Sequence, residues 1–239
     1  MNQPDLSLHI GNKNYSSWSM RPWVLMTELG LPFQEVMVRF DGFDTGSQFK
    51  QTIHALSPAG QVPVLVDVSV SVSTGGPLVV WDTMAITEYL HERFPQAGVW
   101  PRGTEQRARA RSYCAQMHAG FTALRRHCPM NIEADLREQG ALIWRDQNGV
   151  RQDVAHLTDL WTRALKDADG PMLMGAFSAV DAYFSPVVMR LRRYALPVSE
   201  LVQAYMDRVC ALPSVAAWEA QARAEADFLA FEEPYRLHR

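Results

Sequence analysis

Long hydrophobic runs are missing from this 239-residue chain, and no apolar stretch approaches the roughly 20 residues that a membrane-spanning helix needs. A strong charge of either sign is also missing: the formal net charge is -3, which gives no reason to expect nucleic-acid or anionic-membrane binding. Residues 1–5 have no signal-peptide character, so a cytoplasmic location is the expectation. With 47% hydrophobic and 21% charged residues, the composition is that of a globular protein of one or two domains.

Cysteine is scarce, and the three cysteines, Cys114, Cys128 and Cys210, form no Cys-X-X-Cys pair. Their odd number and helix-like surroundings indicate neither a disulfide framework nor a zinc site, and they favour buried structural thiols. The histidines show no metal-ligand spacing either, and we expect structural roles for His54, His118 and His127. No metal centre is therefore expected.

Proline and glycine cluster in residues 94–103, where they interrupt two helical patterns. This cluster predicts a linker between one domain over residues 1–94 and a second over residues 104–239. The first part alternates as β-α-β-α-β-β-α, which is typical of a small α/β sandwich. The second part has helical periodicity throughout, with helices expected over 104–126, 150–167, 178–194, 199–212 and 214–226.

Two local patterns refine this division. Residues 66–73 alternate at period two, and residues 74–76 can turn the chain back into a strand over 78–80. We expect this long hairpin to be a local elaboration or a contact surface. Ser178 and Asp181 flank a capping box directly before an apolar run, which predicts a helix start with a role in folding.

Three serine hydroxyls are crowded into residues 15–22, Tyr-Ser-Ser-Trp-Ser-Met-Arg-Pro, after a short strand-like run at 6–10. Pro22 suits the first turn of a helix, and Gly30 with Pro32 ends the helical pattern. The segment is therefore a predicted strand-to-helix turn. Helix caps are one role for such serines, and help in holding an anion such as a thiolate at the helix start is another.

A second signal follows in residues 57–65, Ser-Pro-Ala-Gly-Gln-Val-Pro-Val-Leu, and in residues 81–86, Trp-Asp-Thr-Met-Ala-Ile. Together with the serine turn, these pieces resemble the thioredoxin-like amino-terminal domain of the glutathione transferases. The resemblance implies an α/β thioredoxin-like domain followed by an all-α helical-bundle domain. It also implies glutathione as co-substrate, a homodimer, and a small-molecule electrophile in a cleft between the domains.

The resemblance assigns roles to the residues that match these motifs. A cis bond between Val62 and Pro63 would leave the preceding backbone free to pair with the cysteinyl amide of glutathione. Asp82 and Thr83 would hold the γ-glutamyl end of the tripeptide, and Gln61 would lie near its glycyl carboxylate. These residues form the expected glutathione site.

The chemistry implied by this site is thiolate formation on glutathione. A free thiol has a pKa of about 8.5, whereas the thiolate is the nucleophile. One serine donor on a helix end suffices, because a hydrogen bond to a charged group is worth about 1.5–3 kcal/mol and one pKa unit is about 1.4 kcal/mol. The serine keeps its own proton and stabilises the sulfur.

The choice of serine depends on which class the turn resembles. The pattern Ser-Ser-X-Ser-X-Arg is similar to the zeta class, in which the first serine of the pair maps to Ser16. Theta- and delta-like enzymes instead place the serine four residues before the arginine, at Ser17. We rank Ser16 slightly first, with Tyr15 a third candidate whose expected role is packing or lining the mouth. Trp18 stands where zeta enzymes carry cysteine, which argues against their maleylacetoacetate isomerase activity.

Arginines and apolar residues of the second domain receive weaker assignments. Arg21 and the run Arg107, Arg109 and Arg111 are expected to have structural or surface roles, and Arg190 and Arg193 cannot be aligned with a zeta substrate-binding arginine. The cleft wall opposite the serine turn has plausible apolar liners in Tyr113, Met117, Phe121, Pro129 and Met130, but such residues at helical spacing more often belong to the ordinary core. Such a wall suits a small hydrophobic electrophile.

The sequence thus predicts a glutathione transferase that conjugates a small hydrophobic electrophile. Within enzymes, the alternatives are a zeta-like isomerase and a glutathione-dependent lyase, dehalogenase or peroxidase. The alternative of another class is a non-catalytic binding or regulatory module, because fold does not determine function.

Overall fold

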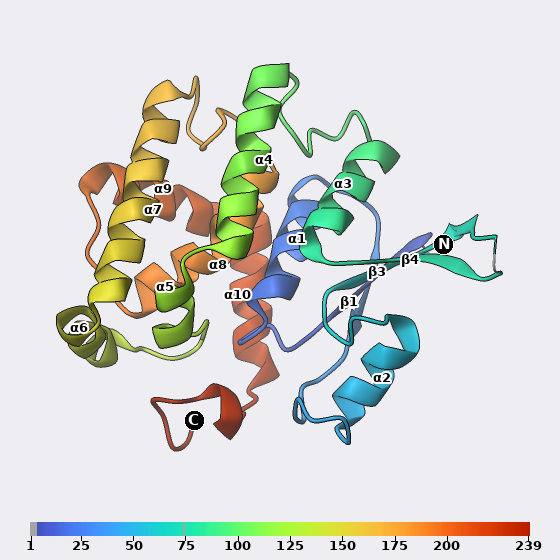
Figure 1. Ribbon diagram of the computed structural model, residues 1–239, viewed down its shortest axis with the longest axis horizontal. Coiled ribbons are helices and arrows are strands. Elements are labelled where there is room, and N and C mark those ends of the chain that lie inside the picture. The colour runs from blue at the N-terminus through green and yellow to red at the C-terminus, as the bar shows by residue number, and fades with distance from the viewer. Residues whose placement is uncertain (1–3, 74) are drawn as a thin grey trace.

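The computed structural model describes residues 4–73 and 75–239, which form a sheet-containing domain beside a helical domain (Figure 1). The sheet has four strands in the order β2-β1-β3-β4. Its strands are β1 (Leu6–Ile10), β2 (Gln34–Met37), β3 (Val64–Ser71) and β4 (Pro77–Trp81). β1 pairs with β2 in parallel and with β3 in antiparallel orientation. This is the expected α/β thioredoxin-like domain.

Helices cover both faces of this sheet (Figure 1). α1 (Ser17–Glu28) and α3 (Thr83–Arg93) lie on one face, and α2 (Gln48–Leu56) lies on the other. In β1 the side chains at alternate positions, Leu6, Leu8 and Ile10, are buried against the first pair of helices. The separate cluster under α2 contains Phe40, Phe49 and Ile53. The burial of every second side chain therefore holds β1 against these helices, and the serine turn follows this strand.

The predicted hairpin is present, with a β-bulge or irregularity in the β3–β4 pairing between Asp67 and Ser71. Asp67 is fully buried and accepts hydrogen bonds from the Ser69 amide and the Tyr89 hydroxyl. Beyond it the strand leaves the core, and Val68 is exposed. Of the predicted turn over 74–76, residue 74 lies outside the described residues.

The helical domain begins after the linker and differs from expectation at two places. The helix expected over 104–126 is two helices, α4 (Thr104–Ala119) and α5 (Thr122–His127). Gly120 ends α4, and Phe121 adopts a left-handed backbone conformation with φ 54°. A helix that was not predicted, α6 (Arg137–Asp146), precedes α7 (Asn148–Asp167). The helical periodicity of α6 is interrupted by Gly140, which approaches the Tyr194 carbonyl too closely to admit a Cβ atom.

The central helix of this domain is α8 (Ala179–Arg193), which is buried from Ala179 to Leu191. Its predicted capping box is confirmed: the Asp181 carboxylate accepts from the Ser178 amide, and the Ser178 hydroxyl caps the helix start. Asp181 also accepts hydrogen bonds from the Leu173 amide and the Tyr205 hydroxyl. Burial raises the pKa of Asp181 to about 6 despite these donors. The capping box therefore ties the start of α8 to the loop before it and to a neighbouring helix.

The chain ends with α9 (Glu200–Ala211), α10 (Pro213–Glu225) and a C-terminal segment that contains the short helix η1 (Ala230–Glu232). α10 packs against α1, and the C-terminal segment returns towards the region between the two domains (Figure 1). Cys114 and Cys128 are buried, and Cys210 is partly buried. Over the described part of the chain, no helix combines the length and apolar character needed to cross a membrane.

Candidate active site

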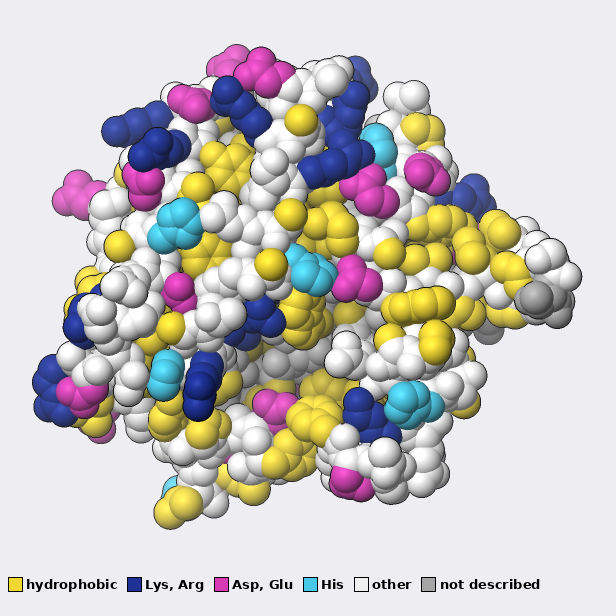
Figure 2. Space-filling model, viewed as in Figure 1, with side chains coloured by type: hydrophobic (Ala, Val, Ile, Leu, Met, Phe, Trp, Pro, Cys, Tyr) yellow, Lys and Arg dark blue, Asp and Glu magenta, His cyan; other side chains and the backbone are white. Residues whose placement is uncertain are grey.

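A cavity of about 830 Å³ opens where the two domains meet. Figure 2 shows this face of the molecule hollowed near its centre, with basic, acidic and histidine side chains around the hollow. All seven residues predicted from the sequence motifs line the cavity, namely Ser16, Ser17, Gln61, Val62, Pro63, Asp82 and Thr83. The structure therefore brings the separate motifs together at one place.

The serine turn forms the start of α1. Ser16 is the N-cap residue, and its Oγ accepts from the Ser19 amide at 3.4 Å and donates to the Ser19 Oγ at 2.7 Å. Ser17 is the first residue of the helix. Pro22 lies inside the helix and not in its first turn, so the expectation for that residue was wrong by about one turn. The helix starts earlier because Ser16 supplies the side-chain cap.

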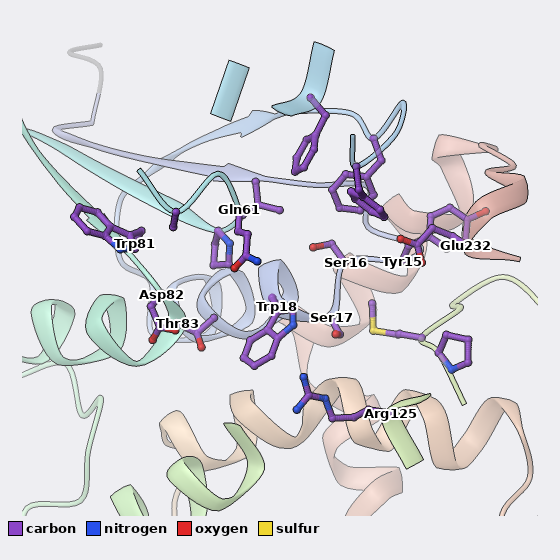
Figure 3. A pocket seen from close by; sticks show the side chains of 18 of the residues that line it. Tyr15, Ser16, Ser17, Trp18, Gln61, Trp81, Asp82, Thr83, Arg125 and Glu232 are labelled. Atoms are coloured by element: carbon purple, nitrogen blue, oxygen red, sulfur yellow. The ribbon is translucent and has the colours of Figure 1, made fainter. Parts of the chain in front are cut away.

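The two serines face different parts of the cavity. In Figure 3, Ser16 is turned towards Gln61 of the sheet domain, whereas Ser17 is turned towards Arg125 of the helical domain. The Ser17 Oγ accepts a hydrogen bond from the Arg190 Nη2 at 3.2 Å. Ser16 is thus engaged within its own turn, and Ser17 is engaged across the domain boundary.

The opposite rim of the sheet domain is formed by the segment before β3. The Val62–Pro63 peptide bond is cis, as the resemblance implied. Gln61 is exposed at the rim, and Pro63 is buried. Lys50, a cavity residue that the sequence analysis missed, donates from its Nζ to the Gly60 carbonyl at 2.8 Å. The rim therefore combines a cis peptide bond with a cation.

Asp82 and Thr83 form the start of α3. The Asp82 Oδ1 accepts from the Met84 amide at 2.7 Å, and its Oδ2 lies 3.4 Å from the His118 Nε2. The backbone of Asp82 has a φ of 74°, which is strained for a residue other than glycine and is a conformation that clusters at functional sites. Thr83 is buried. A carboxylate is thus held at the end of the cavity nearest the sheet.

The helical wall is cationic, which the sequence analysis did not predict. Arg125 and Arg190 line the cavity, and Arg21 lies behind Trp18. The Cζ atoms of Arg21 and Arg125 lie 3.9 and 5.0 Å from the centre of the Trp18 ring. Within residues 4–73 and 75–239, no carboxylate lies at ion-pair distance from any of the three guanidinium groups.

Burial lowers the pKa of each of these arginines. The pKa of Arg21 falls to about 9 and that of Arg190 to about 10, in both cases chiefly because the guanidinium is removed from water. The pKa of Arg125 is lowered by the same cause. All three groups still carry their charge at neutral pH, so this wall of the cavity has positive potential.

Only part of the predicted apolar wall is present. Pro129 and Met130 line the cavity, whereas Met117 and Phe121 are buried in the core and Tyr113 packs against it. For these three residues the ordinary-core alternative is the one that the structure shows, and helical periodicity alone does not reveal which face a helix turns towards a cleft. The arginine run at 107–111 also lies away from the cavity: Arg111 pairs with Glu88, and Arg107 binds linker carbonyls.

Tyr15 lines the cavity, but its hydroxyl is occupied. It donates to the Glu233 Oε1 at 2.8 Å and accepts from the Leu229 amide at 3.2 Å. Burial and the bond to Glu233 raise the pKa of Tyr15 to about 12. The phenol is therefore neutral and already committed to the C-terminal segment.

The C-terminal segment contributes a further residue that the sequence analysis missed. Glu232 lines the cavity, and the Phe231 ring packs edge-on against Phe43 with 5.3 Å between ring centres. Burial, with a smaller contribution from Glu233, raises the pKa of Glu232 to about 7. No recognised motif covers this part of the chain, and its contacts join residues far apart in sequence.

Comparison with known proteins agrees with this geometry. Residues 15–93 match the family model described as "Glutathione S-transferase, N-terminal domain". An 89-residue segment is 36% identical to the dichloromethane dehalogenase of Methylorubrum extorquens, covering 37% of this chain and 27% of that protein. Over 152 residues the chain is 29% identical to the maleylacetoacetate isomerase of Pseudomonas aeruginosa, covering 63% of each. Similarity to these curated relatives therefore spans less than two thirds of their length.

Solved structures match over more of the chain. A glutathione transferase homologue from Burkholderia, with bound glutathione, has a TM-score of 0.66 at 24% identity and covers 92% of this chain and 98% of its own. A glutathione transferase from Methylococcus capsulatus has a TM-score of 0.63 at 22% identity, covering 92% and 99%. The chain therefore has the glutathione transferase fold. Within it, residues 15–93 are the part that matches the glutathione S-transferase N-terminal domain model.

The melting temperature of Glu232→Gln minus that of the unchanged chain should be larger at high pH than at low pH. Because the folded state raises the pKa of Glu232 from 4.5 to about 7, it binds this proton more tightly than the unfolded state does. The stability that protonation contributes is lost as pH rises through this interval. Melting temperatures measured at about pH 5 and about pH 8 check the sign.

The exposed Glu92→Gln is the matched control for that measurement. A Glu232→Gln variant whose melting-temperature difference from the unchanged chain is the same at both pH values would contradict the effect of burial.

Proposed function

We propose that the protein is a glutathione-dependent transferase that activates glutathione as a thiolate through a serine hydroxyl. The observation that supports it best is the convergence of the serine turn, the cis-Pro segment and the Asp82–Thr83 helix start on one cavity. These segments are distant in sequence, and a structural role for each would not require a shared cavity. Homodimerisation is part of the same proposal.

Glutathione fits the cavity by charge and by backbone geometry. The backbone beside Val62 offers peptide groups to the cysteinyl amide, in the manner of a strand added to a sheet edge. Asp82 supplies a negative charge for the γ-glutamyl ammonium. Gln61 and Lys50, both lining the rim, supply donors for the glycyl carboxylate.

Asp82→Asn should weaken glutathione binding by about tenfold, because the ligand ammonium loses a charged partner while the amide can still cap α3. Isothermal titration calorimetry measures this directly, with Glu92→Gln, exposed on the same helix, as the control. Folded, unaltered protein that shows no heat of binding at millimolar glutathione would reject the transferase and favour a binding module. Equal affinity in the unchanged protein and Asp82→Asn would remove Asp82 from the site.

Ser17 is the serine whose geometry suits contact with sulfur. The Ser16 hydroxyl donates to Ser19, so its proton is directed within the turn. The Ser17 hydroxyl accepts from Arg190, and its proton remains available for a thiolate. The helix start adds about 0.3–1 kcal/mol of preference for an anion at this position. Ser16 remains the alternative, with capping as its competing role.

Ser17→Ala should raise the pKa of bound glutathione by about one unit, because the thiolate loses one hydrogen-bond donor. Ser16→Ala should shift that pKa less and instead lower the free energy of unfolding by about 1 kcal/mol through loss of the cap. Ultraviolet thiolate absorbance against pH, together with urea unfolding, separates the two effects. A thiol pKa shift larger in Ser16→Ala than in Ser17→Ala would reverse the assignment.

The proposed second substrate is a small electrophile with an apolar body. Trp18, Trp81, Pro129 and Met130 supply apolar surface in the cavity. Conjugation to an aryl halide or epoxide uses only the thiolate and this surface, so it is the reaction that needs the fewest further groups. Dehalogenation and peroxide reduction use the same thiolate.

A second candidate is glutathione-dependent isomerisation or addition on an acidic compound. The observation that favours it is the guanidinium of Arg125, which has no carboxylate at ion-pair distance among the described residues and faces Ser17 and Trp18 in Figure 3. A substrate carboxylate would supply the missing counter-charge. This observation weakens the expectation, drawn from Trp18, the apolar wall and the unaligned arginines, that a hydrophobic electrophile is preferred over an acidic one.

Arg125→Met distinguishes the two candidates. If the substrate is acidic, kcat/KM for a maleyl ketone analogue should fall about tenfold or more while that for a neutral aryl halide changes little. If the substrate is wholly apolar, the aryl halide should be the better substrate of the unchanged protein. Arg125→Met should then keep the kcat/KM of the unchanged protein for the aryl halide. Arg126→Met, at the neighbouring exposed position, is the control.

A further inference from the structure

Arg190 is a buried cation at the boundary between the two domains. It lies in the last turn of α8, with only 6% of its surface exposed, and it lines the cavity. Burying a guanidinium without a carboxylate partner is costly, so its retention there requires compensating hydrogen bonds. The contacts of its three nitrogen atoms show how it is held.

Two of these contacts fix the guanidinium plane within the helical domain. The Nε donates to the Cys128 carbonyl at 2.9 Å, and the Nη1 donates to the Pro186 carbonyl at 3.2 Å. These acceptors come from different segments, one directly before the cavity residue Pro129 and the other one turn earlier on α8. The rigid fork therefore has one orientation, and its third nitrogen is aimed at α1.

The third contact determines how the Ser17 hydroxyl is used. The Nη2 of Arg190 donates to the Ser17 Oγ at 3.2 Å. An arginine has no acceptor, so Ser17 must be the acceptor in this bond and its own proton must point elsewhere. Across the described residues, 4–73 and 75–239, the Ser17 Oγ has no other hydrogen-bond partner, and the cavity lies beside it.

A charged donor on its oxygen also makes the hydroxyl a stronger donor. Hydrogen bonds in a chain polarise one another, and the effect is larger where water is excluded. Ser16 lacks this polarisation, because its partner is the neutral Ser19 hydroxyl. The two adjacent serines therefore differ in the charge of their hydrogen-bond partner as well as in the direction of their hydroxyl groups.

We propose that Arg190 is the positioning residue that turns the Ser17 hydroxyl into the hydrogen-bond donor for the glutathione sulfur. This inference rests on the proposed glutathione-dependent function. The thiol proton leaves to solvent, Ser17 keeps its proton, and Arg190 stays protonated throughout, so no group in the protein changes its charge. Arg190 acts on the sulfur through Ser17.

A double-mutant cycle distinguishes action through Ser17 from the direct field of a nearby cation. The variants are Ser17→Ala, Arg190→Met and the two combined, and the readout is the pKa of bound glutathione from ultraviolet thiolate absorbance. We expect each single change to raise this pKa by about one unit. In the Ser17→Ala background, Arg190→Met should add less than about a third of its single effect.

Additive shifts would overturn the proposal, because they would mean that Arg190 acts on the sulfur through space. An unchanged pKa in Arg190→Met would overturn it as well. Arg192→Met, which removes an exposed arginine of the same helix, is the matched control and should leave the thiol pKa unchanged. Glutathione affinity, measured by calorimetry on every variant, identifies a loss of the site as a whole.

Arg190→Lys supports the same cycle if Arg190→Met does not fold. The ammonium keeps the charge but cannot hold two carbonyls and a hydroxyl in the planar fork, so the pKa should again rise, and only when Ser17 is present. A lysine variant with the original thiol pKa would contradict an orienting role. Failure of the unaltered protein to bind glutathione would instead reject the proposed function, which separates the two failures.

Discussion

The packing of α1 against α8 determines how the site is built, because each helix carries one half of it. α1 begins at the serine turn, and α8 carries the buried arginine that reaches it. The position of α8 is itself determined by Asp181, a buried carboxylate with three donors that ties the helix start to its surroundings. A carboxylate without those donors would be too costly to bury. The site geometry thus depends on a polar cap at the far end of α8.

On the helical side of the cavity, positive charge is the main electrostatic feature, and among the described residues no carboxylate pairs with its buried arginines. The desolvation of Arg21, Arg125 and Arg190 is offset in part by carbonyl acceptors and in part by the π face of Trp18. Trp18 therefore has a clear physical role in contact with the guanidinium groups of Arg21 and Arg125. Its indole ring contacts two guanidinium groups and offsets part of the free energy that their desolvation costs. These groups lie beside a site that is proposed to hold an anion.

Short sequence motifs predicted the sheet domain and the site residues that this domain contributes. Ser16, Ser17, Asp82 and Thr83 are helix-start residues, and such positions follow from cap preferences and the resemblance together. Arg190 is 173 positions from Ser17, and no local pattern links residues at that separation. Gly120 was a signal for the break between α4 and α5, but helical periodicity on both sides concealed it. The choice between core and cleft stayed open for Met117 and Phe121, because the pattern of a helix gives the apolar face and not its neighbour.

The C-terminal segment supplies a third wall that belongs to neither domain. Asp227 pairs with Arg39 and accepts from Asn12, both in the sheet domain, while Tyr235 donates to the His127 carbonyl in the helical domain. Its contacts with Tyr15 and Phe43 close one side of the cavity. Because Glu232 of this segment lines the cavity while Asp227 and Tyr235 are held by different domains, this wall is placed by both domains at once. A shift of one domain relative to the other would therefore change the position of this wall and the shape of the cavity.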